Sequence, residues 1–180
     1  MPRICVFCGS RTANQAAYSQ AAAQLGTALA ERGIGLVFGA GHVGLMGVLA
    51  DAVLAGGGEA IGVIPQALVD RELAHRQLTA LHIVESMHDR KALMAEFADA
   101  FLAIPGGYGT LEELFEIVTW KQLRLHAKPI GMLNVAGFFD PLLAWIDRAI
   151  AADFIKPKHR GLLLVGQEID PLLDRLLSLT

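Results

Sequence analysis

The sequence contains a glycine loop that is followed closely by carboxylates. Pro105-Gly106-Gly107-Tyr108-Gly109-Thr110 leaves backbone N–H groups uncovered by side chains, and such a nest ahead of a helix prefers an anion such as a phosphate. Glu112, Glu113 and Glu116 come next in the sequence. A carboxylate beside a phosphate site indicates chemistry on the molecule that carries the phosphate.

The same residues also have a purely structural explanation. Thr110 at an N-cap, with Glu113 three residues later, matches the capping box, in which the two side chains bond the first free amides of a helix. The pattern by itself leaves both explanations open.

Arg90 supplies the complementary charge. Helical spacing places it on one stripe with Met87, Met94 and Phe97, so it faces the core. A buried charge needs a partner, and an arginine in a first turn opposes the helix dipole, so we expect Arg90 to face an anion. The alternative is a guanidinium that reaches the surface along its stem. Lys91 lies about 100° further round the helix and could be a solvated surface charge.

Two other glycine-rich segments follow apolar runs, Cys8-Gly9-Ser10 and Gly39-Ala40-Gly41-His42-Val43-Gly44. The second matches the G-x-G-x-x-G fingerprint of dinucleotide sites. Against such a site, it follows the second apolar run, and the next one ends Val63-Ile64-Pro65-Gln66 without the acid that binds the ribose. We favour a tight turn whose amides approach a phosphate or ribose.

Histidines and cysteines indicate no cofactor chemistry. Cys5 and Cys8 fit buried thiols at a strand end better than a redox or zinc pair. His88 in a first turn is more often structural than catalytic. The remaining histidines show no spacing typical of a metal site, and we expect no metal: His42, His75, His82, His126 and His159.

Strands and helices alternate along the chain. Short apolar runs closed by turn residues predict buried strands: Arg3 to Phe7, Gly35 to Phe38, Ala60 to Ile64, Leu81 to Val84, Ala100 to Ile104, Pro129 to Leu133 and Leu162 to Val165. Helical spacing predicts helices between them: Ala16 to Arg32, Leu45 to Ala55, His88 to Ala98, Leu111 to Leu123, Leu142 to Ala152 and Pro171 to Leu179. Such alternation predicts an α/β fold, a doubly wound parallel sheet with helices on both faces. Its ligands bind where strand order reverses, so the glycine loops should share one edge.

Composition limits the class of partner. The 180 residues fit one domain over 1–180, and 53% hydrophobic residues suit a sheet covered on both faces. A net charge of -3 argues against nucleic acid and favours a small molecule. No apolar run reaches the roughly 18 residues of a membrane span, and the start lacks a signal-peptide cleavage site, so we expect no membrane partner and a cytoplasmic protein. Certain aromatics fit either a dimer face or the core: Trp120, Phe138, Phe139 and Trp145.

Over nearly its whole length the chain resembles the Lonely Guy family of cytokinin-activating phosphoribohydrolases. The resemblance rests on Met87-His88-Asp89-Arg90-Lys91 and on Pro105 to Glu113, and it extends to Phe7-Cys8-Gly9-Ser10, Gly44-Leu45-Met46-Gly47 and Lys128-Pro129-Ile130-Gly131. It implies Rossmann-like homodimers that act without metal or organic cofactor. They release adenine-type bases from nucleoside 5'-monophosphates and leave ribose 5-phosphate.

The resemblance also implies roles for particular residues. Arg90 and Glu113 would be catalytic, with Glu113 stabilising positive charge on the ribose and orienting a water. Glu72 by itself indicates only a solvated carboxylate on a polar loop. Substrate contacts are implied for the following residues: Glu72, Arg90, Lys91, Gly106, Gly107, Tyr108, Gly109, Thr110, Leu111, Glu112 and Thr119.

Other functions stay open at this point. The chain could be a nucleotide sensor without turnover, or an AMP nucleosidase with no role in cytokinin formation. Relatives often carry the label lysine decarboxylase, which would need a pyridoxal phosphate Schiff base on a lysine such as Lys91 or Lys121. The residues do not distinguish isopentenyladenine-type bases from plain adenine.

Overall fold

Short apolar runs form the strands of one sheet in the computed structural model, which describes residues 1–71 and 73–180. The strands are β1 (Arg3–Phe7), β2 (Gly35–Phe38), β3 (Ala60–Pro65), β4 (Ala80–Val84), β5 (Ala100–Ala103), β6 (Ile130–Leu133) and β7 (Leu163–Gly166). Every pairing is parallel, and the order is β4-β3-β2-β1-β5-β6-β7. This confirms the predicted doubly wound sheet.

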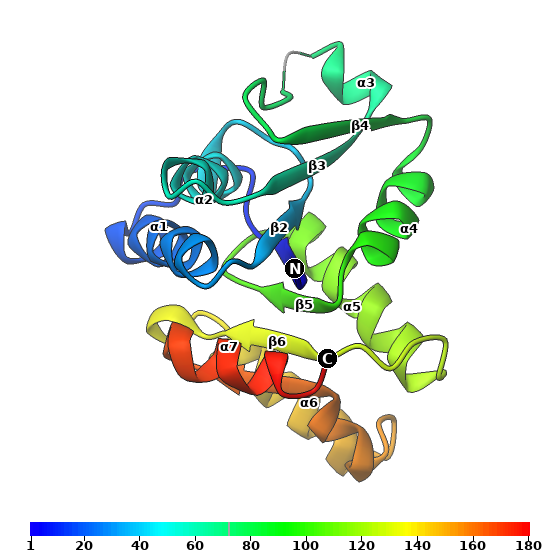
Figure 1. Cartoon of the computed structure of the whole chain (residues 1–180). Helices are drawn as coiled ribbons and strands as arrows, with labels where there is room; N and C mark the ends of the chain where they lie inside the picture. Colours follow the sequence, from blue (N-terminus) through cyan, green and yellow to red (C-terminus); the bar gives the residue numbers. More distant parts are fainter. Residues whose placement is uncertain (72) are drawn as a thin grey trace.

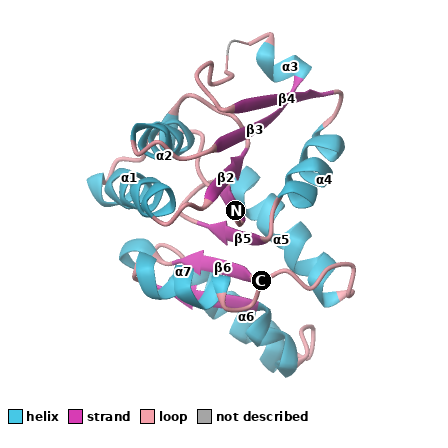
Figure 2. Ribbon diagram, in the orientation of Figure 1, coloured by secondary structure: helices cyan, strands magenta, loops and turns pink. Residues whose placement is uncertain are grey.

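Helices cover both faces of the sheet (Figures 1 and 2). They are α1 (Ala16–Glu31), α2 (Gly44–Ala55), α3 (Gln66–Val69), α4 (Met87–Phe97), α5 (Tyr108–Gln122), α6 (Asp140–Ala151) and α7 (Ile169–Leu177), with 3-10 turns η1 (Val135–Gly137) and η2 (Pro157–Leu162). Leu25 and Leu173 belong to the core under α1, α2 and α7, and Met94 and Leu114 to the core under α4, α5 and α6. In the described part of the chain no helix is long and apolar enough to cross a membrane.

The strand order reverses at β1, which pairs with β2 on one side and β5 on the other. The loops that leave these strands are bonded together, because Gly9 N–H donates to Pro105 O at 3.1 Å and Met46 N–H donates to Gly9 O at 3.3 Å. The prediction that the glycine loops share one edge is therefore confirmed. In doubly wound sheets this edge is where ligands bind.

Two expectations from the sequence need correction. The run from Leu81 to Val84 is a strand, but it is the edge strand β4, and Ile83 is 51% exposed. Helix α5 begins at Tyr108 with Gly107 as its N-cap, ahead of the expected start at Leu111. Thr110 therefore lies inside the first turn and does not cap the helix, so the capping-box explanation was wrong.

Candidate active site

A pocket of about 520 Å³ lies at the carboxyl edge of the sheet, a size typical of small-molecule sites. Glycines from all three loops line it: Gly9, Gly39, Gly41, Gly107 and Gly109. Arg90 comes from α4, and Thr110, Glu112 and Glu113 come from the start of α5. The pocket thus combines bare loop amides, a guanidinium and carboxylates.

Arg90 is 8% exposed and is held by strand-end carbonyls. Its Nε donates to Val63 O at 3.1 Å and its Nη2 to Gly39 O at 2.9 Å. The expected core-facing position is confirmed, and the described partners of Nε and Nη2 are neutral carbonyls. That Arg90 also faces an anion stays a prediction. Nη1 contacts only the weak acceptor Met87 Sδ, at 3.6 Å, among the described residues, and so keeps donor capacity toward the pocket.

Gly39 is explained by this guanidinium. A Cβ at residue 39 would overlap Arg90 Nη2, so a larger residue there would displace the guanidinium from its carbonyl partners. A Cβ at Gly47 would overlap His42 O in the same way. These glycines of the second loop therefore make room for neighbouring protein atoms, which agrees with the tight turn favoured over a dinucleotide fingerprint.

Glu113 is 9% exposed and lines the pocket. Burial raises the pKa of its carboxyl to about 7, although the nearby charge of Arg90 opposes the shift. An acid with a pKa close to neutral can exchange a proton at physiological pH, which suits a general base or acid. Cys8 lines the same pocket, and burial raises the pKa of its thiol well above its usual range, so it stays protonated.

The first turn of α5 presents an unsatisfied hydroxyl. Thr110 is 3% exposed, and its Oγ1 has no hydrogen-bond partner among the described residues. A Cβ at Gly106 would overlap this hydroxyl, so glycine is needed there as well. Leaving a buried hydroxyl without a partner is costly, and a ligand oxygen at the start of α5 would supply one.

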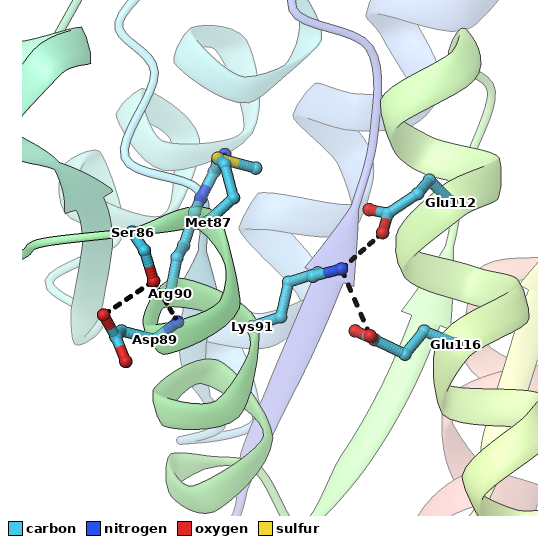
Figure 3. A network of polar contacts seen from close by, with 7 residues as sticks. All are labelled: Ser86, Met87, Asp89, Arg90, Lys91, Glu112 and Glu116. Carbon is cyan, nitrogen blue, oxygen red and sulfur yellow. Dashed lines mark hydrogen bonds and ion pairs between the residues drawn. The ribbon is translucent and has the colours of Figure 1, made fainter.

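Lys91 joins α4 to α5 (Figure 3). Its Nζ donates to Glu112, and to Glu116 at 3.2 Å, and the lysine is 9% exposed. Burial lowers the pKa of Lys91, but the two hydrogen bonds outweigh burial and the net shift is upward. The alternative of a solvated surface charge is therefore wrong for Lys91. Ser86, at the start of α4, caps the helix by accepting from Asp89 N–H at 3.1 Å.

The structure does not bring every expected residue to the pocket. Thr119 is exposed near the end of α5 and does not line the pocket. The buried Lys91 of α4 does not line the pocket either. Tyr108 lines the pocket with a side chain that is 97% exposed. Gly106 lines an adjoining cavity of about 210 Å³. Glu72 lies outside the described residues.

Sequence reasoning missed most of the apolar wall of the pocket and one cation. The wall is formed by these side chains: Val6, Val43, Met46, Ile64, Leu68, Leu73 and Met87. Arg11, which follows the first glycine loop, also lines the pocket. The wall comes from separate loops and strand ends, so no periodic pattern in the sequence identifies it.

The fold and the pocket define a Rossmann-like α/β protein with a small-molecule-sized pocket at the point where its strand order reverses. A sequence profile for a family described as "Possible lysine decarboxylase" matches residues 46–176. The cytokinin riboside 5'-monophosphate phosphoribohydrolase LOG of Oryza sativa subsp. japonica is 52% identical, over 90% of this chain and 67% of its own length. The LOG1 enzyme of Arabidopsis thaliana, with the same activity in its name, is 48% identical over 97% of this chain and 82% of its own length. The chain belongs to this family, the Lonely Guy family.

Solved structures share the fold at low identity. The molybdenum cofactor carrier protein of Chlamydomonas reinhardtii superposes with a TM-score of 0.74 at 20% identity, covering 98% of each chain. The molybdenum cofactor binding protein of Rippkaea orientalis gives 0.73 at 18% identity, covering 98% of this chain and 96% of its own. These likenesses establish the arrangement of strands and helices only.

Proposed function

We propose that the protein hydrolyses the N-glycosidic bond of cytokinin riboside 5'-monophosphates, releasing the adenine-type base and ribose 5-phosphate. The observation that carries the proposal is the pocket itself, in which a buried carboxyl of pKa about 7 lies beside a buried arginine and an unsatisfied hydroxyl at a helix start. The relatives named for this activity share about half of their residues with the chain.

The start of α5 suits the 5'-phosphate. The amides of Gly107 and Gly109 lie where the helix dipole favours negative charge, and Thr110 Oγ1 can donate to a phosphate oxygen. Binding the phosphate there fixes the ribose relative to the carboxylate in the same pocket. Remote binding of this kind positions the reacting carbon.

Glu113 suits the reacting centre. As the bond between base and ribose breaks, positive charge develops on the ribose ring, and a fixed carboxylate stabilises it. The same carboxylate can accept a proton from the water that attacks the ribose carbon. A pKa of about 7 allows the group to be ionised before the reaction and protonated after it.

Arg90 supports Glu113 electrostatically and can hold a substrate oxygen through Nη1. Its charge lowers the pKa of Glu113 against the effect of burial, so it increases the ionised fraction at neutral pH. The two carbonyls that hold Nε and Nη2 fix the guanidinium plane. Removing Arg90 therefore weakens both the charge balance and the positioning in the pocket.

The apolar wall suits the base. Val43, Leu73 and Met87 are each at least 36% exposed and line the pocket. Apolar surface left open to solvent in a pocket favours a ligand with an apolar substituent, such as an isoprenoid chain on adenine. Plain AMP lacks that substituent and fills the wall less completely.

A decarboxylase reaction fits these residues poorly. A pyridoxal Schiff base requires a lysine amine that reaches the pocket. Lys91 Nζ is bonded to two carboxylates, and Lys121 Nζ donates to Lys128 O at 2.9 Å. Neither lysine lines the pocket.

The exposed aromatics support the homodimer that the resemblance implies. Trp145 is 53% exposed and Phe154 is 87% exposed, and both line one apolar depression on α6 and its following loop. Phe139, in contrast, belongs to the core. Light scattering at micromolar concentration gives the mass directly, and a mass of one chain would refute the homodimer.

A kinetic panel with product identification tests the proposed reaction. AMP and isopentenyladenosine 5'-monophosphate are incubated with wild type, Glu113→Gln and Arg90→Ala, and the released base is quantified by chromatography. We expect base release by wild type and a loss of at least ~100-fold in both variants. Wild-type turnover in both variants would refute the assigned roles.

The same panel separates the alternatives. Faster release from AMP than from the isopentenyl substrate would favour an AMP nucleosidase. Tight nucleotide binding by wild type with no base released over hours would favour a sensor. Nucleosides without the phosphate are expected to react far more slowly, and equal rates would reject the phosphate role of the loop.

A further inference from the structure

A short segment outside the catalytic groups is fastened to the second glycine loop. Residues 73–77, here called the strap, follow α3 and precede β4. Gly41 and Ala74 form an antiparallel bridge, in which His42 N–H donates to Leu73 O at 3.1 Å and His75 N–H donates to Ala40 O at 2.8 Å. Leu73 lines the active-site pocket, so the strap forms part of its wall.

The His75 side chain holds the strap in place. It is buried, and its Nδ1 accepts from Gln77 N–H at 3.2 Å. The ring proton therefore lies on Nε2, which donates to Asp51 Oδ1 of α2 at 2.9 Å. One neutral imidazole thus closes the turn of the strap and ties it to a helix that is distant in the sequence.

The strap also contacts a strained residue, Ala40, which follows the carbonyl group of Gly39 that holds Arg90. Ala40 has a φ of 60°, in the left-handed region, which is unfavourable for a residue with a Cβ. Such conformations persist where surrounding contacts fix them. His75 N–H fixes the carbonyl of Ala40, and the carbonyl of the preceding residue, Gly39, accepts from Arg90 Nη2. One hydrogen bond therefore joins the strap to Ala40, and another joins the adjacent Gly39 to the guanidinium.

We propose that His75 and Asp51 form a latch that keeps Arg90 in its working position by holding the strap against the Gly39–Gly41 turn. The proposal rests on the proposed function, because it assigns a purpose to the position of Arg90. His75 and Asp51 are positioning residues, since both line a separate depression of about 440 Å³ and neither lines the active-site pocket.

Substitutions can remove the two bonds of His75 separately. In His75→Asn, the side-chain oxygen can take the place of Nδ1 and accept from Gln77 N–H, but the bond to Asp51 is lost. In His75→Gln, the terminal amide can reach Asp51 in place of Nε2. Asp51→Asn keeps an acceptor oxygen for Nε2–H, whereas Asp51→Ala keeps none.

Steady-state kinetics with the nucleoside monophosphate is the first measurement. We expect His75→Ala and Asp51→Ala to lose ~10- to 100-fold in kcat/KM, mainly in kcat, because a small displacement of a positioned group has effects of this size. Asp51→Asn should retain most of the rate. His159→Ala, a histidine in η2 away from the pocket, is the matched control and should behave as wild type.

The pH profile distinguishes a latch from a purely structural role. Arg90 lowers the pKa of Glu113, so a displaced guanidinium should move the acid limb of the kcat/KM profile to higher pH in His75→Ala. Loss of stability by itself would leave that limb in place. The charged groups that act on Glu113 come from α4 and α5: Arg90, Lys91, Glu112 and Glu116. His42 and Arg76 lie beside the latch itself.

Amide hydrogen exchange tests the contacts without relying on turnover. The His42 and His75 amides should exchange ~10-fold faster or more in Asp51→Ala than in wild type, with the amides of β1 unchanged. Unchanged exchange at both amides, or a wild-type rate and pH profile in His75→Ala and Asp51→Ala, would overturn the latch. Absence of base release by wild type would instead refute the proposed function, and the exchange data would still decide whether the latch contacts exist.

Discussion

Arg90 and Glu113 are both buried in the pocket, and no described ion pair joins them to each other. Nε and Nη2 of the guanidinium donate to carbonyl oxygens, which do not neutralise its charge. The carboxyl keeps a pKa near 7 because burial outweighs the attraction of the arginine. Among the described residues neither group forms an ion pair, so both charges are open to interaction with a charged substrate.

Replacing Glu113 by glutamine should change how stability depends on pH. The folded-state pKa of about 7 lies above the ordinary value of 4.5, so the folded protein binds a proton more tightly than the unfolded chain. This tighter proton binding stabilises the fold in full below pH 4.5, and the stabilisation is lost as pH rises through 7. Glutamine does not ionise, so Glu113→Gln does not lose stability in this range. At pH 8 we expect its free energy of unfolding to exceed that of wild type by up to about 3 kcal/mol.

Urea denaturation at pH 5 and pH 8 measures the effect. Equal stability of the variant and wild type at both pH values would show that the carboxyl titrates normally.

The same pKa predicts that kcat/KM of wild type rises with pH through about 7, because the proposed base must be ionised.

Thr110→Val should separate binding from stability. Valine keeps the shape of threonine and removes the hydroxyl that has no partner among the described residues. We expect unchanged or higher thermal stability, because no protein hydrogen bond is lost. KM for the monophosphate should rise ~10-fold, corresponding to about 1.4 kcal/mol of lost binding, while the weak reaction of the riboside stays the same. An unchanged KM would place the phosphate elsewhere.

At the scale of elements, α4 and α5 bring the two halves of the site together, and Lys91 joins the two helices through Glu112 and Glu116 (Figure 3). Lys91→Met removes a buried cation and leaves Glu112 and Glu116 as neighbouring like charges on one helix face. We expect the free energy of unfolding to fall by ~1–2 kcal/mol. The fall is smaller than for a fully buried pair because Glu112 is half exposed.

A double-mutant cycle with Glu116→Gln checks this assignment by denaturation. A coupling free energy near zero would mean that the pair contributes nothing to stability. Arg160, whose ion pair with Asp147 lies on the surface near α6, provides a control for exposed pairs. We expect Arg160→Met to cost under 1 kcal/mol.

Sequence patterns predicted these elements well wherever a hydrophobic period was long enough. The strands and the longer helices match their predicted ranges to within a few residues. The start of α5 differed from the predicted one, because Gly107 can act as an N-cap without a side chain. Thr110 and Glu113 have the spacing of a capping box but lie inside the helix. Helix α3 was not predicted, since Gln66–Val69 is a single turn and carries no measurable period.

The site was predictable only where chemistry and spacing coincide. Arg90 stood out because a buried charge in a first turn is unusual, whereas Glu113 was one of three carboxylates after the glycine loop and was singled out by the family resemblance. The bond between His75 and Asp51 was not predictable, because it joins a loop to a helix across 24 positions with no motif. Gly39 matched a dinucleotide pattern, although the structure shows that it accommodates Arg90.

At the scale of the whole molecule, the pocket draws on four strand ends, those of β1, β2, β3 and β5, and on the first turns of α4 and α5. Residues far apart in the sequence therefore depend on one sheet for their mutual position. A ligand in this pocket contacts elements from both sides of β1, where the sheet reverses its order. Its binding should consequently stabilise the folded chain as a unit.

Ribose 5-phosphate, the proposed product, should raise the midpoint of thermal unfolding. At a concentration 100 times its Kd, a ligand that binds only the folded state adds about 2.7 kcal/mol. For a chain of this size that corresponds to a shift of roughly 5–10 °C. Differential scanning calorimetry with ribose 5-phosphate, ribose and inorganic phosphate measures this shift.

Thr110→Val should need a higher concentration of ribose 5-phosphate for the same shift. Lys91→Met should start from a lower midpoint and keep the full shift. An equal shift with ribose would show that the loop before α5 does not hold the phosphate, because only the phosphate distinguishes the two ligands.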